Sequence, residues 1–324
     1  MDMPISTRET LTFEYFFMLL LVSESFRKHR TPAGHPERVE RYAAVTDALK
    51  AIPNLEYAQA RPATKEELGR VHKPEYIERI EQFCAAGGGQ LDADTFAVPE
   101  SWDAACRAAG ACVQAVEYVL SGKGRAVFCA VRPPGHHARP AAPMGFCLFN
   151  NVAVGAAAAI SVHGLQRILI VDWDLHHGNG TQEIFYEDPR VFYYSMHRWP
   201  FWPGTGSAQE TGRGAGKGFT LNVPIAAGTQ RQEVRALFRA GLEDIAARFA
   251  PELVIISAGF DMHRADPMGG NALEAEDYAE MTAEIAELFV KTEGRGIVSC
   301  LEGGYNLEAL GASAARHVAA LKAL

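Results

Sequence analysis

The segment Arg167-Ile-Leu-Ile-Val171-Asp172-Trp-Asp174-Leu-His176-His177-Gly-Asn179 joins a short apolar run to a cluster of acidic and histidine side chains. A continuous apolar run of this length is typical of a strand that is buried on both faces of a parallel sheet. In open parallel sheets, ligands bind beyond the carboxyl ends of the strands. The segment therefore predicts a buried strand that delivers polar side chains to one edge of a sheet.

The same kind of apolar, β-rich run recurs along the chain. The further predicted strands are Met18 to Val22, Ala126 to Val131, Val191 to Met196, Phe219 to Val223, Leu253 to Ala258 and Gly296 to Leu301. Helix-like stretches lie between several of them, at Pro36 to Lys50, Trp102 to Leu120, Asn151 to Val162, Gln232 to Phe249 and Ala275 to Lys291. This alternation predicts an α/β fold, in which helices cover both faces of a parallel sheet. Because no repeat or low-complexity linker divides the chain, we expect a single domain.

Composition narrows the class of protein. The chain has 324 residues, 48% of them apolar, and a net charge of -8. An acidic surface repels phosphates, so we expect no nucleic-acid partner. The apolar run at residues 16–22 is far shorter than the roughly 20 residues of a membrane span, and no signal-peptide pattern surrounds it. Six cysteines without a Cys-x-x-Cys pair predict reduced thiols and a cytoplasmic location.

Four polar motifs each follow a predicted strand. They are Arg132-Pro-Pro-Gly-His136-His137, Asp172-Trp-Asp174-Leu-His176-His177-Gly-Asn179, Asp261-Met-His263 and Glu302-Gly-Gly-Tyr305. Any one of them could be a helix cap or a surface turn. Together they predict a functional site at the carboxyl edge of the sheet.

A metal site is the first chemistry that these motifs indicate. Asp174 and His176 are two residues apart, so on extended backbone their side chains point to the same side. Asp261, from a neighbouring strand end, completes a set of three ligands. Carboxylate and imidazole suit Zn²⁺, and three protein ligands leave a coordination position open for water. Ferrous iron accepts the same ligands, so both metals stay open.

Hydrolysis also requires proton transfer and stabilisation of an oxyanion. His136 and His137 are candidates for the general base and acid, because histidine titrates near neutral pH. They could instead be metal ligands or a pair on the surface. Tyr305 follows two glycines that allow close approach of the backbone, so its hydroxyl could reach the site. The alternative is that Tyr305 is a packing residue.

Taken together, the motifs resemble the histone deacetylase family, in its class II and bacterial deacetylase-like branch. The resemblance runs from Thr31-Pro-Ala-Gly-His-Pro-Glu-Arg38 to Glu302-Gly-Gly-Tyr305 and rests also on Arg132–Ala138, Gly145–Asn151, Asp172–Gly180 and Ser257–Asp261. It implies an arginase-like three-layer α/β/α sandwich with a mainly parallel eight-stranded sheet. Residues 18–324 would form one deacetylase domain, after an extension of unknown role at residues 1–17.

The resemblance also implies a role for each matched residue. Asp174, His176 and Asp261 would hold zinc, and His137 would act as general base and acid. His136 would be an electrostatic partner; Asp172 would pair with His136, and Asn179 with His137. Tyr305 would polarise the acyl carbonyl. Phe146 and Trp202 would flank an apolar tunnel for acyl-lysine. The site would further include Gly145, Met268 and Gly303. A structural potassium ion would lie near Asp172, Asp174, His176, Ser195 and Met196.

Two positions refine the expected chemistry. Position 179 is Asn where the class I branch has Asp, and a neutral partner does not raise the pKa of His137 as a carboxylate would. Position 305 is Tyr where some class II relatives carry His and act weakly on acetyl-lysine. We therefore expect an active enzyme.

Three alternatives remain open at this point. The same chemistry could deacetylate acetylpolyamines, although polyamine-preferring relatives place an acidic residue after the Asp-Pro pair, where this chain has Met268. An arginase-like ureohydrolase would need two bridged metals and more ligands. A silent acyl-lysine binding module would lack a catalytic residue, whereas every candidate is present here. The preferred acyl length and the oligomeric state are left open.

Overall fold

The computed structural model describes residues 18–269, 272–291 and 295–324, so the predicted extension at residues 1–17 lies outside the described part. Its centre is an eight-stranded sheet made of β1 (Met18–Val22), β2 (Leu55–Gln59), β5 (Ala126–Cys129), β6 (Ile168–Asp172), β7 (Val191–Arg198), β8 (Thr220–Ile225), β9 (Leu253–Ala258) and β10 (Ile297–Leu301). The strand order is β2-β1-β5-β10-β9-β6-β7-β8, and each neighbouring pair is parallel.

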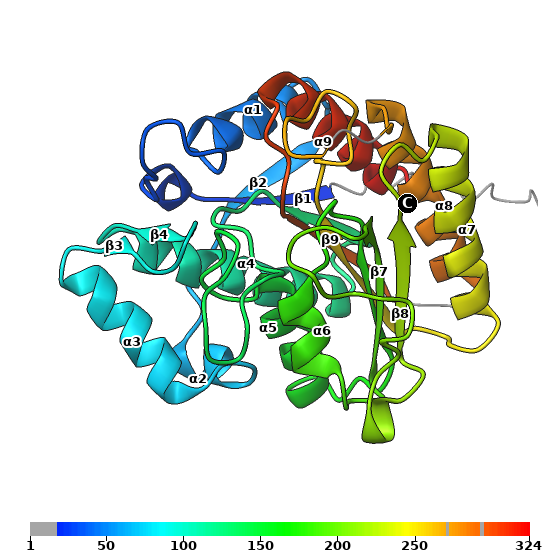
Figure 1. Cartoon of the computed structure of the whole chain (residues 1–324), viewed down its shortest axis with the longest axis horizontal. Coiled ribbons are helices and arrows are strands. Elements are labelled where there is room, and N and C mark those ends of the chain that lie inside the picture. Colours follow the sequence, from blue (N-terminus) through cyan, green and yellow to red (C-terminus); the bar gives the residue numbers. More distant parts are fainter. Residues whose placement is uncertain (1–17, 270–271, 292–294) are drawn as a thin grey trace, which may run out of the picture.

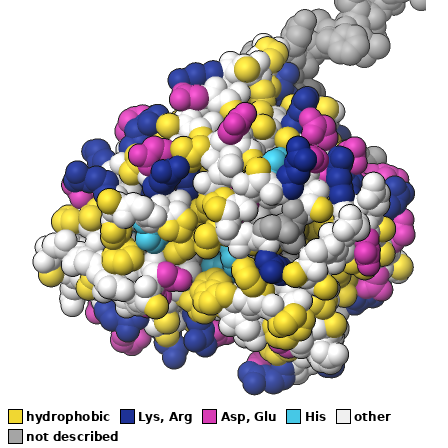
Figure 2. Space-filling model, turned by 45° about the horizontal axis from the view of Figure 1, so that its top comes forward, with side chains coloured by type: hydrophobic (Ala, Val, Ile, Leu, Met, Phe, Trp, Pro, Cys, Tyr) yellow, Lys and Arg dark blue, Asp and Glu magenta, His cyan; other side chains and the backbone are white. Residues whose placement is uncertain are grey.

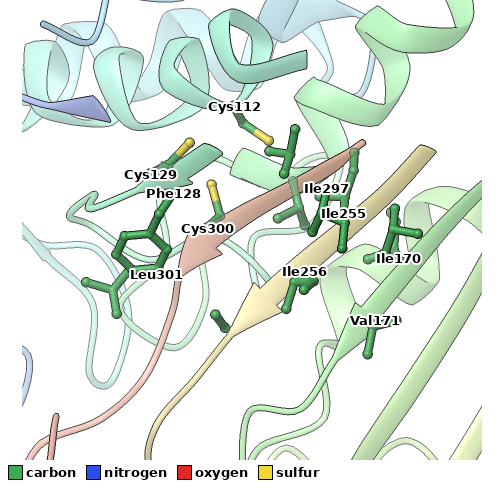
Figure 3. Packing of buried hydrophobic residues seen from close by; sticks show 14 of the residues in the cluster. Cys112, Phe128, Cys129, Ile170, Val171, Ile255, Ile256, Ile297, Cys300 and Leu301 are labelled. Carbon is green, nitrogen blue, oxygen red and sulfur yellow. The ribbon is translucent and has the colours of Figure 1, made fainter. Parts of the chain in front are cut away.

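The central strands are buried along their whole length. Every residue of β5, β6, β9 and β10 is buried, which fits their continuous runs of Val, Ile and Leu. Figure 3 shows how Ile255 and Ile256 of β9 lie between side chains of the two neighbouring strands. These apolar side chains form the core that holds the strand ends in fixed positions.

Two layers of helices cover the sheet (Figure 1). One layer consists of α1 (Glu40–Leu49), α9 (Leu307–Lys322), α8 (Ala275–Lys291) and α7 (Arg231–Ala246). The other contains α4 (Ser101–Leu120), α5 (Asn151–Ser161) and α6 (Asn179–Phe185). Within each layer, successive helices of these series contact one another. The expected arginase-like α/β/α sandwich is confirmed.

Several elements were not predicted, and most of them are short. They are η1 (Glu24–Arg27), α2 (Lys65–Gly69), α3 (Pro74–Ala85), β3 (Gly89–Gln90), β4 (Phe96–Ala97) and η2 (Gly214–Gly216), together with β2, α6 and α9. Strand β2 has no fully buried residue, because it is an edge strand that pairs only with β1. Helices α2 and α3 and the β3–β4 hairpin pack on α4 and α5 around a second, smaller core.

Two sequence expectations concern the whole chain. All six cysteines are free and buried, as expected for reduced thiols in an apolar core. Among the described helices, none combines the length and the hydrophobicity that crossing a bilayer requires.

Candidate metal centre and active site

The four polar motifs meet at the carboxyl edge of the sheet. They follow β5, β10, β9 and β6, which are consecutive neighbours in the strand order. Because these strands are parallel, all four end at the same edge. The convergence predicted from the sequence is therefore what the fold produces.

Asp174, His176 and Asp261 form a buried group that could hold a metal ion. One potential ligand atom from each lies within 4.8 Å of the others. His176 Nδ1 is 3.2 Å from Asp174 Oδ1 and 3.1 Å from Asp261 Oδ2. The other carboxylate oxygens are occupied by backbone amides, because Gly303 N donates to Asp174 Oδ2 and Leu175 N donates to Asp261 Oδ1, both at 2.8 Å.

The electrostatics of this group fit a divalent cation. Burial and the neighbouring carboxylate of Asp174 raise the pKa of Asp261 to about 7. Two adjacent buried carboxylates are costly unless a positive charge compensates them, and two carboxylates with one imidazole suit Zn²⁺ or Fe²⁺. The described residues contain one such group, whereas a ureohydrolase site would need a second metal with its own ligands.

The local backbone of this group differs from the expectation. Strand β6 ends at Asp172, and residues 174–176 form a bend rather than extended chain. His176 N donates to Asp174 Oδ1 at 2.9 Å, and this side-chain acceptor stabilises the bend. The two side chains reach the same site as expected. They do so because the bend brings them together, and not because they alternate along a strand.

The histidine pair follows β5, and each ring has the expected neighbour. His136 Nδ1 lies 3.0 Å from Asp172 Oδ2, and His137 Nδ1 lies 2.8 Å from Asn179 Oδ1. Both rings are buried, with their centroids 3.9 Å apart. The roles of these residues in catalysis stay predictions, but the two contacts give the rings different environments.

The two histidines differ in charge. Burial opposes protonation of His136, but the carboxylates of Asp172, Asp174 and Glu302 outweigh it and raise its pKa to about 10. Burial and the positive charge of His136 hold the pKa of His137 well below its usual value. The surroundings thus favour the charged form of His136 and the neutral form of His137, which can accept a proton.

Tyr305 reaches the site through a turn that requires glycine. Gly304 has φ +120°, a conformation that residues with a Cβ rarely adopt. A Cβ on Gly303 would lie 2.5 Å from Asp174 Oδ2 and from Asp261 Oδ2. The buried Tyr305 ring packs edge-on against Phe146, with centroids 5.9 Å apart, and the guanidinium of Arg41 lies 5.0 Å from its centroid.

A cavity of about 150 Å³ opens beside the metal group. Its lining residues are Asp94, His137, Gly145, Phe146, His176, Phe201, Trp202, Met268 and Tyr305. Hydrophobic side chains gather near the middle of the face in Figure 2, and histidine is visible between them. Four of the five residues expected to bind substrate thus share one cavity with His137 and Tyr305.

The fifth substrate residue is placed differently. Gly303 is not among the residues that line the cavity. The turn after β10 brings it against the metal group instead, where its amide donates to Asp174 Oδ2 and leaves no room for a Cβ. Gly303 thus contacts the carboxylates of the metal group, and its part in substrate binding stays a prediction.

Two lining residues were not predicted to bind substrate. Phe201 stacks on the His176 ring, with centroids 5.5 Å apart and an angle of 24° between the planes. Asp94, whose place the sequence could not give, lies in the cavity wall, where burial and Asp92 raise its pKa. Both come from loops without a recognisable pattern, so only an aromatic residue next to Trp202 and an acidic residue in a polar loop could have hinted at them.

The residues of the expected potassium site are neighbours. Asp172 and Ser195 are opposite each other in the β6–β7 pair, and Met196 follows in β7. Asp172 Oδ2 accepts a hydrogen bond from the Tyr193 hydroxyl at 3.0 Å, and Ser195 Oγ lies 2.9 Å from His197 Nδ1. The side chains thus have protein partners, and the potassium site stays a prediction.

Glu302 is a further residue of the site whose role the sequence did not reveal. Its buried carboxylate accepts hydrogen bonds from Gly135 N at 2.7 Å and from His136 N at 3.2 Å. It therefore fixes the backbone of the histidine pair. The signal was a charged residue at the end of an otherwise apolar strand, since such a residue needs buried partners.

Fold and site together define a class of protein. A buried Asp-His-Asp group beside a histidine pair, at the carboxyl edge of a parallel sheet in an α/β/α sandwich, is an arrangement suited to metal-dependent hydrolysis. A sequence profile of the histone deacetylase domain matches residues 35–321. The chain belongs to the histone deacetylase family, as its motifs indicated.

Individual relatives agree with this assignment. The chain is 38% identical over 294 residues to a probable deacetylase of Archaeoglobus fulgidus, which covers 89% of this chain and 81% of the relative. It is 42% identical over 299 residues to the human polyamine deacetylase HDAC10, covering 87% of this chain and 44% of that protein. The crystal structure of the HDA15 HD domain has a TM-score of 0.89 at 37% identity, covering 95% of this chain and 89% of that one.

Proposed function

We propose that this hydrolase removes acyl groups from lysine side chains of proteins or peptides in a zinc-dependent reaction. The observation that carries the proposal is the single cavity that His137, His176 and Tyr305 share. It brings a candidate metal ligand, a neutral imidazole and a phenolic hydroxyl to one apolar space. Hydrolysis of the amide adds water and releases a carboxylate and a free amine.

Each residue has a distinct task in this proposal. Zinc, held by Asp174, His176 and Asp261, would supply Lewis-acid polarisation of the acyl carbonyl. Neutral His137 takes a proton from the attacking water and returns it to the leaving nitrogen, so the proton balance closes. Charged His136, beside Asp172, adds positive potential next to the developing oxyanion, and the Tyr305 hydroxyl donates a hydrogen bond to it.

The cavity walls support a substrate with a long apolar stem. Phe146 and Trp202 offer aromatic surface on which the methylene groups of a neutral acyl-lysine can be buried. Trp202 is 39% exposed, which suits a residue at the cavity mouth. Met268 adds further apolar surface at the position where an acidic residue would favour a charged amine.

Acetylpolyamine deacetylation is the second candidate. Two observations favour it, namely the carboxylate of Asp94 in the cavity wall and the similarity to a protein named polyamine deacetylase. The ammonium groups of a polyamine would be attracted by that carboxylate. Because Met268 provides no second negative charge, we place acyl-lysine first.

Further parts of the proposal concern the molecule as a whole. We propose that residues 18–324 act as one deacetylase domain and that a potassium ion binds near Asp172 and Ser195. Free, buried cysteines are compatible with a reducing compartment such as the cytoplasm.

The test is an activity screen on an acetyl-lysine peptide and on N-acetylputrescine, with and without a zinc chelator. We expect faster hydrolysis of the peptide, loss of activity with the chelator and recovery when zinc is added back. Tyr305→Phe should lower kcat at least about tenfold and leave the zinc content unchanged. Full activity of chelated protein, or of Tyr305→Phe, would contradict the mechanism, and a preference for N-acetylputrescine would reverse the order of the two substrates.

A further inference from the structure

Asp266 is a buried carboxylate that the proposed mechanism does not use. It lies on the loop between β9 and α8 and is 5% exposed. We propose that Asp266 is a positioning residue that ties the cavity wall at Met268 to the backbone of Tyr305. The inference deepens the proposed function and rests on it, because it assigns Asp266 an effect on both substrate binding and turnover.

Three backbone N–H groups converge on this carboxylate. Met268 N donates to Asp266 Oδ1 at 3.0 Å. Tyr305 N and Asn306 N donate to Asp266 Oδ2, at 2.6 and 3.1 Å. One oxygen atom thus holds the cavity wall, and the other holds the turn that carries the tyrosine.

This arrangement requires a carboxylate rather than an amide. A carboxylate presents two acceptor oxygens and no donor, whereas asparagine would turn an NH₂ group toward at least one of the three N–H groups. A buried carboxylate is costly unless hydrogen bonds compensate it, and these three bonds provide that compensation. The choice of side chain is therefore explained by the two loops that it joins.

The same two loops are joined a second time next to Asp266. Asn306 Nδ2 donates to the carbonyl oxygen of Ala265 at 3.1 Å, while Asn306 Oδ1 caps helix α9 by accepting from Ala309 N at 3.0 Å. The start of α9 is thereby fixed to the β9–α8 loop. Asp266, through its hydrogen bond with Tyr305 N, then determines how the backbone amide of Tyr305 is oriented.

The position of this amide matters because the Tyr305 hydroxyl is at the far end of a long side chain. A small rotation of the backbone moves the hydroxyl by a larger distance, and a misplacement of about 1 Å in an active site can cost about 10²-fold in rate. Arg41 limits movement on the other side, since Arg41 Nε donates to the Gly304 carbonyl oxygen at 2.6 Å. Without Asp266, the backbone of Tyr305 would lose its hydrogen bond on one side, while Arg41 would still hold the Gly304 carbonyl on the other.

Two substitutions separate the two halves of the link. Asp266→Ala removes all three hydrogen bonds. Asp266→Asn retains one oxygen, which should face the two donors Tyr305 N and Asn306 N, so that the bond to Met268 is the one lost. We expect Asp266→Asn to raise KM for an acetyl-lysine peptide at least about threefold with kcat within about twofold of wild type. Asp266→Ala should raise KM and also lower kcat at least about tenfold.

A double-mutant cycle tests whether Asp266 acts through Tyr305. In the Tyr305→Phe background, Asp266→Ala should lower kcat by less than about twofold, because the hydroxyl that it positions is already gone. If the two effects on kcat multiply, Asp266 acts independently and the inference is wrong, while the role of Tyr305 in the proposed function stands. If Tyr305→Phe alone leaves kcat unchanged, the proposed function and the inference both fail.

Asp277→Asn is the matched control, measured together with zinc content and thermal unfolding of each variant. Asp277 is also buried and accepts a backbone amide, from Glu274 N at 2.7 Å, but it lies at the start of α8 and does not line the cavity. We expect it to lose stability with kcat and KM unchanged. If Asp277→Asn reproduces the kinetic changes, they come from general destabilisation and the inference is overturned. If Asp266→Ala does not fold, a KM for Asp266→Asn equal to that of wild type overturns it.

Discussion

At the scale of single residues, the buried histidines show how neighbours decide charge. His136 is held protonated by carboxylates, whereas burial lowers the pKa of His317 to about 3. The ring nitrogens of His317 face two hydroxyls, with Thr282 Oγ1 at 2.6 Å from Nδ1 and Ser299 Oγ at 2.7 Å from Nε2. The same side chain is therefore an electrostatic group in one place and a neutral core residue in another.

His137→Ala tests the proposed general base. Removal of a positioned base typically costs about 10²–10⁴-fold in rate, and we expect a loss of kcat in this range with the zinc content retained. The pKa of His137 is held well below the usual histidine value of about 6.5. The wild-type enzyme should therefore keep its activity from neutral pH to below about pH 6.5, and lose it only at lower pH, when the imidazole becomes protonated. The measurement is a pH–rate profile for both proteins.

The control for this substitution is His163→Ala, because His163 is exposed. It should leave the rate and the profile unchanged. If His137→Ala keeps kcat within about threefold of wild type, His137 is not the general base. The same holds if the rate of the variant falls at low pH in the same way as that of wild type.

His317 predicts an acid sensitivity of the fold. Its folded-state pKa of about 3 lies below the ordinary histidine value of about 6.5, so the unfolded chain binds the additional proton between these pH values. The free energy of unfolding that depends on neutral His317 is complete above pH 6.5 and falls by at most about 1.4 kcal/mol per pH unit below it. Denaturant unfolding at about pH 7 and about pH 5 measures this loss.

His317→Gln should make that pH dependence shallower, because glutamine can keep polar contacts but cannot be protonated. His163→Gln, at an exposed position, should leave it as in wild type. An equal slope for His317→Gln and wild type would mean that His317 is not protonated on unfolding in this range.

At the scale of elements, one buried carboxylate connects the start of α1 to the loop after β5. Glu37 Oε2 accepts from Arg132 at 2.7 Å, and Glu37 Oε1 accepts from Arg41 at 3.0 Å. Arg132 also donates to the carbonyl oxygen of Phe26, which lies in η1, at 2.8 Å. Arg132 begins the loop that carries the histidine pair. Its ion pair with Glu37 and its hydrogen bond to Phe26 therefore fix the start of that loop.

Glu37→Gln should therefore destabilise the protein strongly. The substitution leaves two buried guanidinium groups without their counter-charge, and breaking a buried pair in this way costs about 3–5 kcal/mol. We expect the free energy of unfolding, measured by denaturant titration, to fall by an amount in this range. Glu24→Gln, which removes an exposed pair with Arg27, should show no measurable change. Equal stabilities of the two variants would contradict the importance of the buried network.

At the scale of the whole molecule, the metal group joins elements that are far apart in sequence. Asp174 and Asp261 come from loops after β6 and β9, and the amide of Gly303, which follows β10, donates to Asp174. Two buried carboxylates without a cation repel each other, whereas a divalent ion would attract both. Metal binding should therefore stabilise the entire sheet edge and not only the site.

Zinc should raise the thermal unfolding midpoint of the chelated protein. A ligand at about a hundred times its dissociation constant contributes about 2.7 kcal/mol, which is a shift of several degrees for a chain of this size. In Asp261→Ala the shift should disappear, while in Asp244→Ala, on the exposed side of α7, it should remain. A zinc-dependent shift that survives in Asp261→Ala would place the metal elsewhere.

The sequence by itself determined the strands that carry the site and the types of side chain at their ends. Runs such as Ile168 to Val171 are apolar over their whole length, so local pattern is enough to identify them. It also determined the metal group and the two histidine contacts, since each of these residues belongs to a recognisable motif. The edge strand β2 was not predicted, because its partly exposed and exposed residues do not form a continuous apolar run.

Only the tertiary structure decided which loops face one another. The order β5-β10-β9-β6 depends on how crossover helices pack, which no local segment encodes. That order brought Gly303 against Asp174 and placed Asp266 between Met268 and Tyr305, and the packing of the remaining loops brought Phe201 and Asp94 into the cavity wall. Contacts of this kind join residues that are distant along the chain, so their geometry exists only once the sheet and both helix layers have packed together.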